Sequence, residues 1–126
     1  MGIYSKAAIA AYTMIVEKSL TPRDAWNAAI ASITTSPSAK RKVCPRATFL
    51  ALADNGYLKG VDSSSSVERG GILSERAIAA ADLVLSHPAA TPRYLADNLD
   101  GYVDKQGSYD IVIELAKNGL LRRARQ

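Results

Sequence analysis

Two stretches of the chain end in the same short pattern, and this repetition restricts the folds that the sequence can adopt. The pattern Leu-Ala-x-Asn-Gly-x-Leu, followed by a basic residue, occurs at 52–59 and again at 115–122. Glycine after a helix takes the left-handed turn without a Cβ clash, so Asn-Gly is a typical helix ending. Each copy therefore predicts a helix that ends at Asn-Gly, with an apolar pair that docks back on it.

Two further matches occur in the same order in both parts of the chain. Ser-x-x-Ala-Ile-Ala-Ala is found at 5–11 and at 74–80, and Thr-Pro-Arg at 21–23 and 91–93. Together with the endings, they predict an internal repeat over 5–60 and 74–123, joined by a linker at 61–73. Two copies indicate two related units packed about a pseudo-twofold axis, because a solenoid needs three or more repeats.

Apolar periodicity and capping residues predict six helices, at about 5–19, 22–35, 44–55, 74–86, 91–99 and 108–118. The predicted fold class is all-α: one helical domain over 1–126, built from two three-helix, helix-turn-helix-like halves. The segments Tyr57–Val61 and Val67–Ile72 leave room for a short β-hairpin at 57–72. The basic loop Ser36–Lys42 has no counterpart in the second half and is interpreted as an insertion.

Composition bounds the class of protein. The chain has 126 residues, 48% apolar content, a formal charge of +4 and one cysteine. A single cysteine cannot form an internal disulfide, which favours a reducing cytoplasm. No apolar run reaches the ~18–20 residues of a membrane span, and the first residues lack the pattern of a signal peptide. We expect a cytoplasmic protein without a membrane partner.

Metal and cofactor chemistry is not indicated. A structural zinc site needs about four ligands, and the chain has one cysteine and one histidine. No glycine-rich phosphate loop is present. We therefore expect no metal, no cofactor and no catalytic residue. A dyad of Cys44 and His87 stays open, because such residues meet in space rather than in sequence; at His87, before a proline, a solvated helix end is the alternative.

Cys44 is the candidate for a reactive thiol. It stands at a predicted helix N-terminus between Lys42 and Arg46. The helix dipole and the two bases favour a thiolate, and the same position suits an anion held by Arg46. The alternative is a half-buried N-cap cysteine without chemical function.

Two groups of basic residues, one at the start of the helix predicted at 44–55 and one after the helix predicted at 108–118, are the candidates for nucleic-acid or anion contact. They are Lys40, Arg41, Lys42, Arg46, Arg122 and Arg123. Nucleic-acid affinity comes mostly from such contacts to phosphates. A helix that ends in Asn-Gly-Leu-Leu and continues into arginines also resembles the close of a winged helix-turn-helix. The alternatives are a solvated basic face and contact with an acidic protein.

Three tyrosines gather in the second half: Tyr94, Tyr102 and Tyr109. They fit either the core or an exposed surface for a partner or a homodimer. The leading functional hypothesis is a non-enzymatic binding or regulatory protein for nucleic acid. A protein-interaction or dimerisation module is the second hypothesis, and a thiol- or anion-dependent activity at Cys44 and Arg46 is the third.

Several runs resemble a family of small uncharacterised bacterial proteins with a Cys-Pro-base-x-x-Phe-Leu core. The matching runs are Ala25-Trp26, Lys42–Leu50, Gly56–Gly60 and the later helix segment Asp110-Ile111-Val112. The resemblance covers most of the chain and implies a bacterial source and no assigned function. The serine run at 63–66 departs from the family pattern, so the resemblance implies nothing about the linker conformation.

Overall fold

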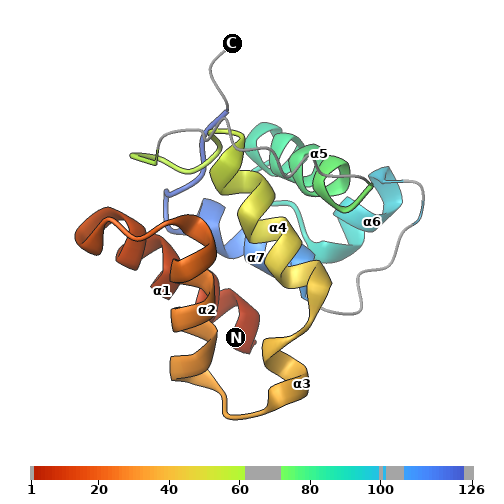
Figure 1. Ribbon diagram of the computed structural model, residues 1–126. Coiled ribbons are helices and arrows are strands. Elements are labelled where there is room, and N and C mark those ends of the chain that lie inside the picture. The colour runs from red at the N-terminus through yellow and green to blue at the C-terminus, as the bar shows by residue number, and fades with distance from the viewer. Residues whose placement is uncertain (1, 62–71, 100, 102–106, 124–126) are drawn as a thin grey trace.

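The computed structural model describes residues 2–61, 72–99, 101 and 107–123, and this part of the chain holds helices and no strand. Six helices have seven or more residues: α1 (Ile3–Lys18), α2 (Pro22–Ile33), α4 (Val43–Asp54), α5 (Ile72–Ser86), α6 (Pro92–Asn98) and α7 (Ser108–Lys117) (Figure 1). The predicted all-α class with six helices is confirmed. A single turn, α3 (Pro37–Lys40), is an addition within the predicted basic loop.

Three helices begin at a Ser-Pro or Thr-Pro pair. The side-chain oxygens of Thr21, Ser36 and Thr91 each accept a hydrogen bond of 3.1–3.3 Å from the backbone N–H three residues later. The proline that follows occupies the first helical position, where its missing N–H costs nothing. This start explains why Ser36–Lys42, predicted as a loop, contains the turn α3.

The core is a single cluster to which every helix except α3 contributes. The central helix is α7, which packs against α1, α4, α5 and α6 (Figure 1). The largest fully buried side chains include Trp26, Phe49, Leu52, Leu58, Leu95, Ile111 and Leu115. None of the described helices is both long and apolar enough to cross a bilayer.

The two predicted halves end in the same local geometry. Asn55 and Asn118 each donate a side-chain hydrogen bond of 2.8 Å to the carbonyl four residues earlier. Gly56 and Gly119 follow with φ of 81° and 70°, a conformation that glycine adopts without strain. The residue after each glycine then closes the helix with a 2.9 Å bond to the carbonyl five residues earlier.

An antiparallel bridge joins these two endings through Leu58 and Leu121. Two backbone hydrogen bonds of 2.8 Å flank the pair: Lys59 N–H to Leu120 O, and Arg122 N–H to Tyr57 O. Leu58 and Leu121 are equivalent positions, each three residues after the terminal asparagine of its half. The bridge therefore pairs each ending with its own repeat equivalent. The duplication of 5–60 and 74–123 as a whole stays a prediction.

The β-hairpin predicted for 57–72 is not present in the described part of that range. Leu58 pairs with Leu121, and Ile72 already belongs to α5. Residues 62–71, which hold most of the predicted linker and its serine run, lie outside the described residues. Pairing with the distant C-terminal segment is favourable because it buries both Leu58 and Leu121, which are 0% and 4% exposed.

Candidate functional site

Four of the predicted contact residues lie together where α3 leads into α4, and we call them the α3–α4 basic cluster: Lys40, Arg41, Lys42 and Arg46. Lys40 ends α3, and Arg46 lies in the first turn of α4. The turn α3 is held in place by the hydroxyl of Tyr4 on α1, which donates 3.0 Å to the carbonyl of Ala39. A contact between distant segments thus positions the cluster.

The α3–α4 basic cluster is exposed and has no intramolecular counterion. All four residues are exposed, and within the described structure none of their side chains forms an ion pair or a hydrogen bond. Between Asp24 and Asp54 the sequence contains no carboxylate. Four positive charges without compensating acids produce a local positive potential that attracts anions.

The two C-terminal arginines are used differently. The Nε of Arg122, a half-buried residue, donates 3.1 Å to the carbonyl of Gly56, and its backbone N–H donates to Tyr57. Arg123 lies 3.5 Å from the carboxylate of Asp82 and donates 2.5 Å to the hydroxyl of Ser86. Both side chains thus contact the body of the protein, and their predicted contact with nucleic acid or an anion stays a prediction.

The segments that carry the two groups of basic residues lie at opposite ends of the molecule (Figure 1). In Figure 1, α3 lies at the bottom of the molecule, whereas the chain beyond α7 runs to the opposite end at the top. Lys40, Arg41, Lys42 and Arg46 thus lie together at α3 and the start of α4, apart from the segment that follows α7 (Figure 1). The C-terminal residues 124–126, including a further arginine, lie outside the described residues.

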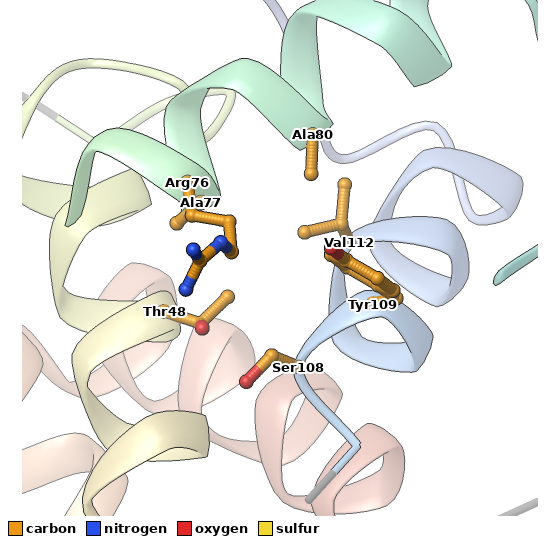
Figure 2. A pocket seen from close by; sticks show the side chains of 7 residues that line it. All are labelled: Thr48, Arg76, Ala77, Ala80, Ser108, Tyr109 and Val112. Atoms are coloured by element: carbon orange, nitrogen blue, oxygen red, sulfur yellow. The ribbon is translucent and has the colours of Figure 1, made fainter. Parts of the chain in front are cut away.

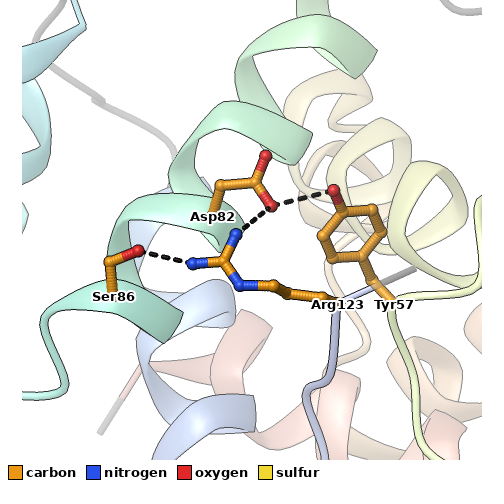
Figure 3. Close-up of polar contacts among 4 residues, drawn as sticks. All are labelled: Tyr57, Asp82, Ser86 and Arg123. Carbon is orange, nitrogen blue, oxygen red and sulfur yellow. Dashed lines mark hydrogen bonds and ion pairs between the residues drawn. The ribbon is translucent and has the colours of Figure 1, made fainter. Parts of the chain in front are cut away.

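Arg123 belongs to a polar network with Tyr57, Asp82 and Ser86 (Figure 3). The Tyr57 hydroxyl donates 2.9 Å to the Asp82 carboxylate, which connects the end of the first half to α5. Burial, the hydrogen bond to Asp82 and the charge of Asp82 raise the pKa of Tyr57 to about 12, against a smaller lowering effect of Arg123. The network therefore favours the protonated phenol.

This shift predicts a loss of stability at alkaline pH. Because the pKa of Tyr57 is raised from 10.0 to about 12, its contribution is complete below pH 10 and disappears as the pH rises to 12. The loss is at most about 2–3 kcal/mol. Urea unfolding of the wild type and of Tyr57→Phe between pH 8 and 12 measures it. We expect the difference in stability between the two proteins to shrink towards pH 12; a constant difference contradicts the assignment.

Cys44 lies in the first turn of α4 and not at its N-cap, which is Lys42. The residue is half-buried, and its carbonyl accepts a 2.8 Å hydrogen bond from Thr48. The reactive thiol stays a prediction. No contact between Cys44 and His87 is found among the described residues, and the dyad also stays a prediction. His87 follows the far end of α5, roughly 20 Å from its start by the helical rise.

The tyrosines of the second half do not form an exposed apolar groove in the described structure. Tyr109 is a core residue with 3% exposure. Tyr94 is half-buried, and its ring lies 5.2 Å from the exposed imidazole of His87, centroid to centroid. Tyr102 lies outside the described residues. Homodimerisation stays a prediction without a described surface to carry it.

A pocket between α4, α5 and α7 contains residues that sequence reasoning missed (Figure 2). It is lined by Thr48, Arg76, Ala77, Ala80, Ser108, Tyr109 and Val112. Figure 2 shows the guanidinium of Arg76 extending towards Thr48 and Ser108, with Tyr109 and Val112 across the opening. The signal in the sequence was Arg76, which replaces the alanine found at the equivalent position of the first half.

Comparison with known proteins places residues 1–122 in one family. The model of a family of unknown function (DUF6979) matches this range. No curated protein and no solved structure matches the chain. The family match agrees with the predicted membership of an uncharacterised family and carries no functional assignment.

Proposed function

We propose that this chain, which belongs to the DUF6979 family of unknown function, is a non-enzymatic protein that binds nucleic acid through the α3–α4 basic cluster. The bacterial source and the Cys-Pro-base-x-x-Phe-Leu core of its relatives are part of the same proposal. The single observation that carries the proposal is four exposed cationic side chains without an intramolecular counterion in the described structure. Each of them is available to neutralise a phosphate and release its counterion.

The side chains of α4 and α7 are largely buried, and for this reason we propose binding to phosphates and not reading of bases by a recognition helix. In α4, Val43 and Arg46 are exposed, whereas the second half of the helix is mostly buried. In α7, Ile111, Val112 and Ile113 are all buried. Neither helix offers the long polar face that a recognition helix inserts into the major groove. Contacts from the basic cluster therefore reach phosphates, which carry no sequence information.

A charge-matched pair of variants tests the proposal. The first variant replaces all four cluster residues, Lys40, Arg41, Lys42 and Arg46, by glutamine. The control replaces four exposed bases elsewhere: Lys18, Lys59, Arg93 and Lys117. Both variants lose the same formal charge, so a difference between them reports where the nucleic acid binds. Fluorescence anisotropy with a labelled single strand and a labelled duplex, in a salt series, gives the affinities.

We expect the cluster variant to bind at least about tenfold more weakly than the control at low salt. The slope of log Kd against log salt concentration should fall by roughly 3, since each lost phosphate contact removes 0.7–0.9. Shuffled sequences should bind equally well. Absence of wild-type binding at low salt, or equal weakening in both variants, overturns the proposal. Cluster-dependent binding of an acidic polypeptide but not of nucleic acid assigns the surface to an acidic protein instead.

A further inference from the structure

We propose that Tyr4 is a positioning residue for the α3–α4 basic cluster, and that it raises the affinity for nucleic acid by holding the turn α3 in its binding position before the ligand binds. This inference rests on the proposed function and deepens it. The phenol of Tyr4 carries no charge at neutral pH, and it acts through the backbone that carries Lys40, Arg41 and Lys42.

The turn α3 has few features that fix its place in the fold. None of its residues is buried, and none belongs to the apolar core, although the turn packs against α2. Ser36 caps the turn from within the same segment, so this cap does not attach it to the body of the protein. A four-residue turn is marginal by itself, because a helix becomes stable only by propagation or by packing. The position of α3 therefore depends on contacts with other helices.

The hydrogen bond from Tyr4 ends on an atom that also belongs to the link between α3 and α4. The carbonyl oxygen of Ala39 accepts 3.0 Å from the Tyr4 hydroxyl and 3.4 Å from the backbone N–H of Lys42. Lys42 is the N-cap of α4, and Lys40 and Arg41 lie between these two residues. One phenol thus connects α1 to the point at which α3 passes into α4.

The ring of Tyr4 is itself held in a fixed place. It is half-buried and packs against the core. Beside it lies Gly107, the N-cap of the central helix α7, and a Cβ added to this glycine would lie 3.4 Å from Cδ2 of the ring. Burial raises the pKa of the Tyr4 phenol, which keeps the hydroxyl protonated and able to donate at neutral pH. The donor that holds α3 is therefore fixed by the body of the protein.

The order of the segment before binding affects the affinity. Every residue that has to be fixed on binding costs conformational entropy, and this cost is subtracted from the binding free energy. Lys40, Arg41 and Lys42 lie on the segment that Tyr4 holds, whereas Arg46 lies beyond it in the first turn of α4. Loss of the Tyr4 hydroxyl should weaken binding without changing the number of phosphate contacts, because all four bases stay in the chain.

A matched pair of tyrosine variants tests this role. Tyr4→Phe keeps the ring and removes the hydroxyl that reaches Ala39. Tyr12→Phe is the control, because Tyr12 is also a half-buried residue of α1 whose hydroxyl donates to a distant backbone carbonyl, that of Lys59, outside the basic cluster. Circular dichroism checks that both variants fold. We expect folding of Tyr4→Phe, since the carbonyl of Ala39 still accepts from Lys42.

Fluorescence anisotropy with the labelled duplex measures the affinities. We expect Tyr4→Phe to bind about two- to tenfold more weakly than the wild type at low salt, the range that one hydrogen bond contributes. Tyr12→Phe should bind as the wild type does. In neither variant should the slope of log Kd against log salt concentration fall by the roughly 0.7–0.9 of one phosphate contact. This slope separates positioning from charge, since the glutamine variant of the cluster lowers it.

Amide hydrogen exchange of the free proteins gives a second measurement, which needs no ligand. The amides of Lys40 and Arg41 donate 3.1 and 3.2 Å to carbonyls of the same segment. They should exchange about two- to tenfold faster in Tyr4→Phe than in the wild type and in Tyr12→Phe, because the segment opens more easily. Amides in the second half of α4, which is mostly buried, should exchange at the same rate in all three proteins.

Three results overturn the inference. They are equal affinities of Tyr4→Phe and Tyr12→Phe, a salt slope that falls in Tyr4→Phe as it does in the cluster variant, and unchanged exchange at Lys40 and Arg41. If the wild type does not bind nucleic acid, the proposed function and the role of Tyr4 in binding both fail, and the exchange rates still show whether Tyr4 holds α3. If binding depends on the cluster but not on Tyr4, only this inference fails.

Discussion

Trp26→Ala is expected to lower the free energy of unfolding by about 3–5 kcal/mol. Trp26 on α2 is 1% exposed, and its ring lies 5.4 Å from that of Phe49 on α4, centroid to centroid, at an interplanar angle of 30°. Truncation removes this aromatic contact and leaves a cavity between two helices that pack on each other. The loss is large because the surrounding helices cannot close the space without shifting.

Urea unfolding followed by far-UV circular dichroism measures this loss. Intrinsic fluorescence cannot be compared, since Trp26 is the chain's one tryptophan. Trp26→Phe is the matched control, because it keeps an aromatic ring beside Phe49 and should retain a large part of the stability. If Trp26→Ala lowers the free energy of unfolding by less than about 1 kcal/mol, the result contradicts the placement of this ring in the core.

Leu121→Ala and Leu58→Ala are each expected to lower the free energy of unfolding by about 2–5 kcal/mol. The two side chains are 4% and 0% exposed and lie opposite each other in the antiparallel bridge. Because each leucine covers the other, removing both should cost less than the sum of the two single effects. The bridge joins the end of the first half to the C-terminal segment, so it stabilises the whole bundle.

A double-mutant cycle measures the coupling between the two leucines. The four proteins are the wild type, the two single variants and the double variant, unfolded in urea under one condition. We expect a coupling energy of about 0.5–3 kcal/mol. The control is a second cycle that combines Leu121→Ala with Leu95→Ala. Leu95 is a buried residue of α6 with 0% exposure. Strict additivity for Leu58 and Leu121 means that the bridge does not link the two endings energetically.

Local sequence was sufficient at two helix starts and two helix endings, where the determining interactions lie within one turn of a helix. Thr21-Pro22 and Thr91-Pro92 predicted helix starts, and both threonines cap their helices. Asn-Gly at 55–56 and 118–119 predicted two helix endings, and both glycines adopt positive φ. A cap or a left-handed turn depends on three to five consecutive residues, so the pattern alone carries the information.

Predictions about strand pairing and about the segment between α2 and α4 were less successful. The segment after Gly56 was expected to pair with 67–72, but it pairs with Leu121 across more than sixty residues. The basic loop was expected to be irregular, but Ser36 caps α3 and Tyr4 holds it. The N-cap of α4 is Lys42 and not Cys44. Alternative strand pairings and alternative helix starts have similar local sequences. The alternative that buries more apolar side chains is the more stable one.

The sequence by itself determined the all-α class, the helix positions and the repeated endings, because these depend on periodicity and on neighbouring residues. Only the tertiary structure decided which of these bases have an intramolecular partner among the described residues. Arg122 and Arg123 resemble Lys40 and Arg41 in sequence, yet the arginines are paired with Gly56 and Asp82. The pocket around Arg76 likewise appears only when three helices are brought together. Pairing and cavity formation depend on distances between residues far apart in the chain, which packing of the core sets.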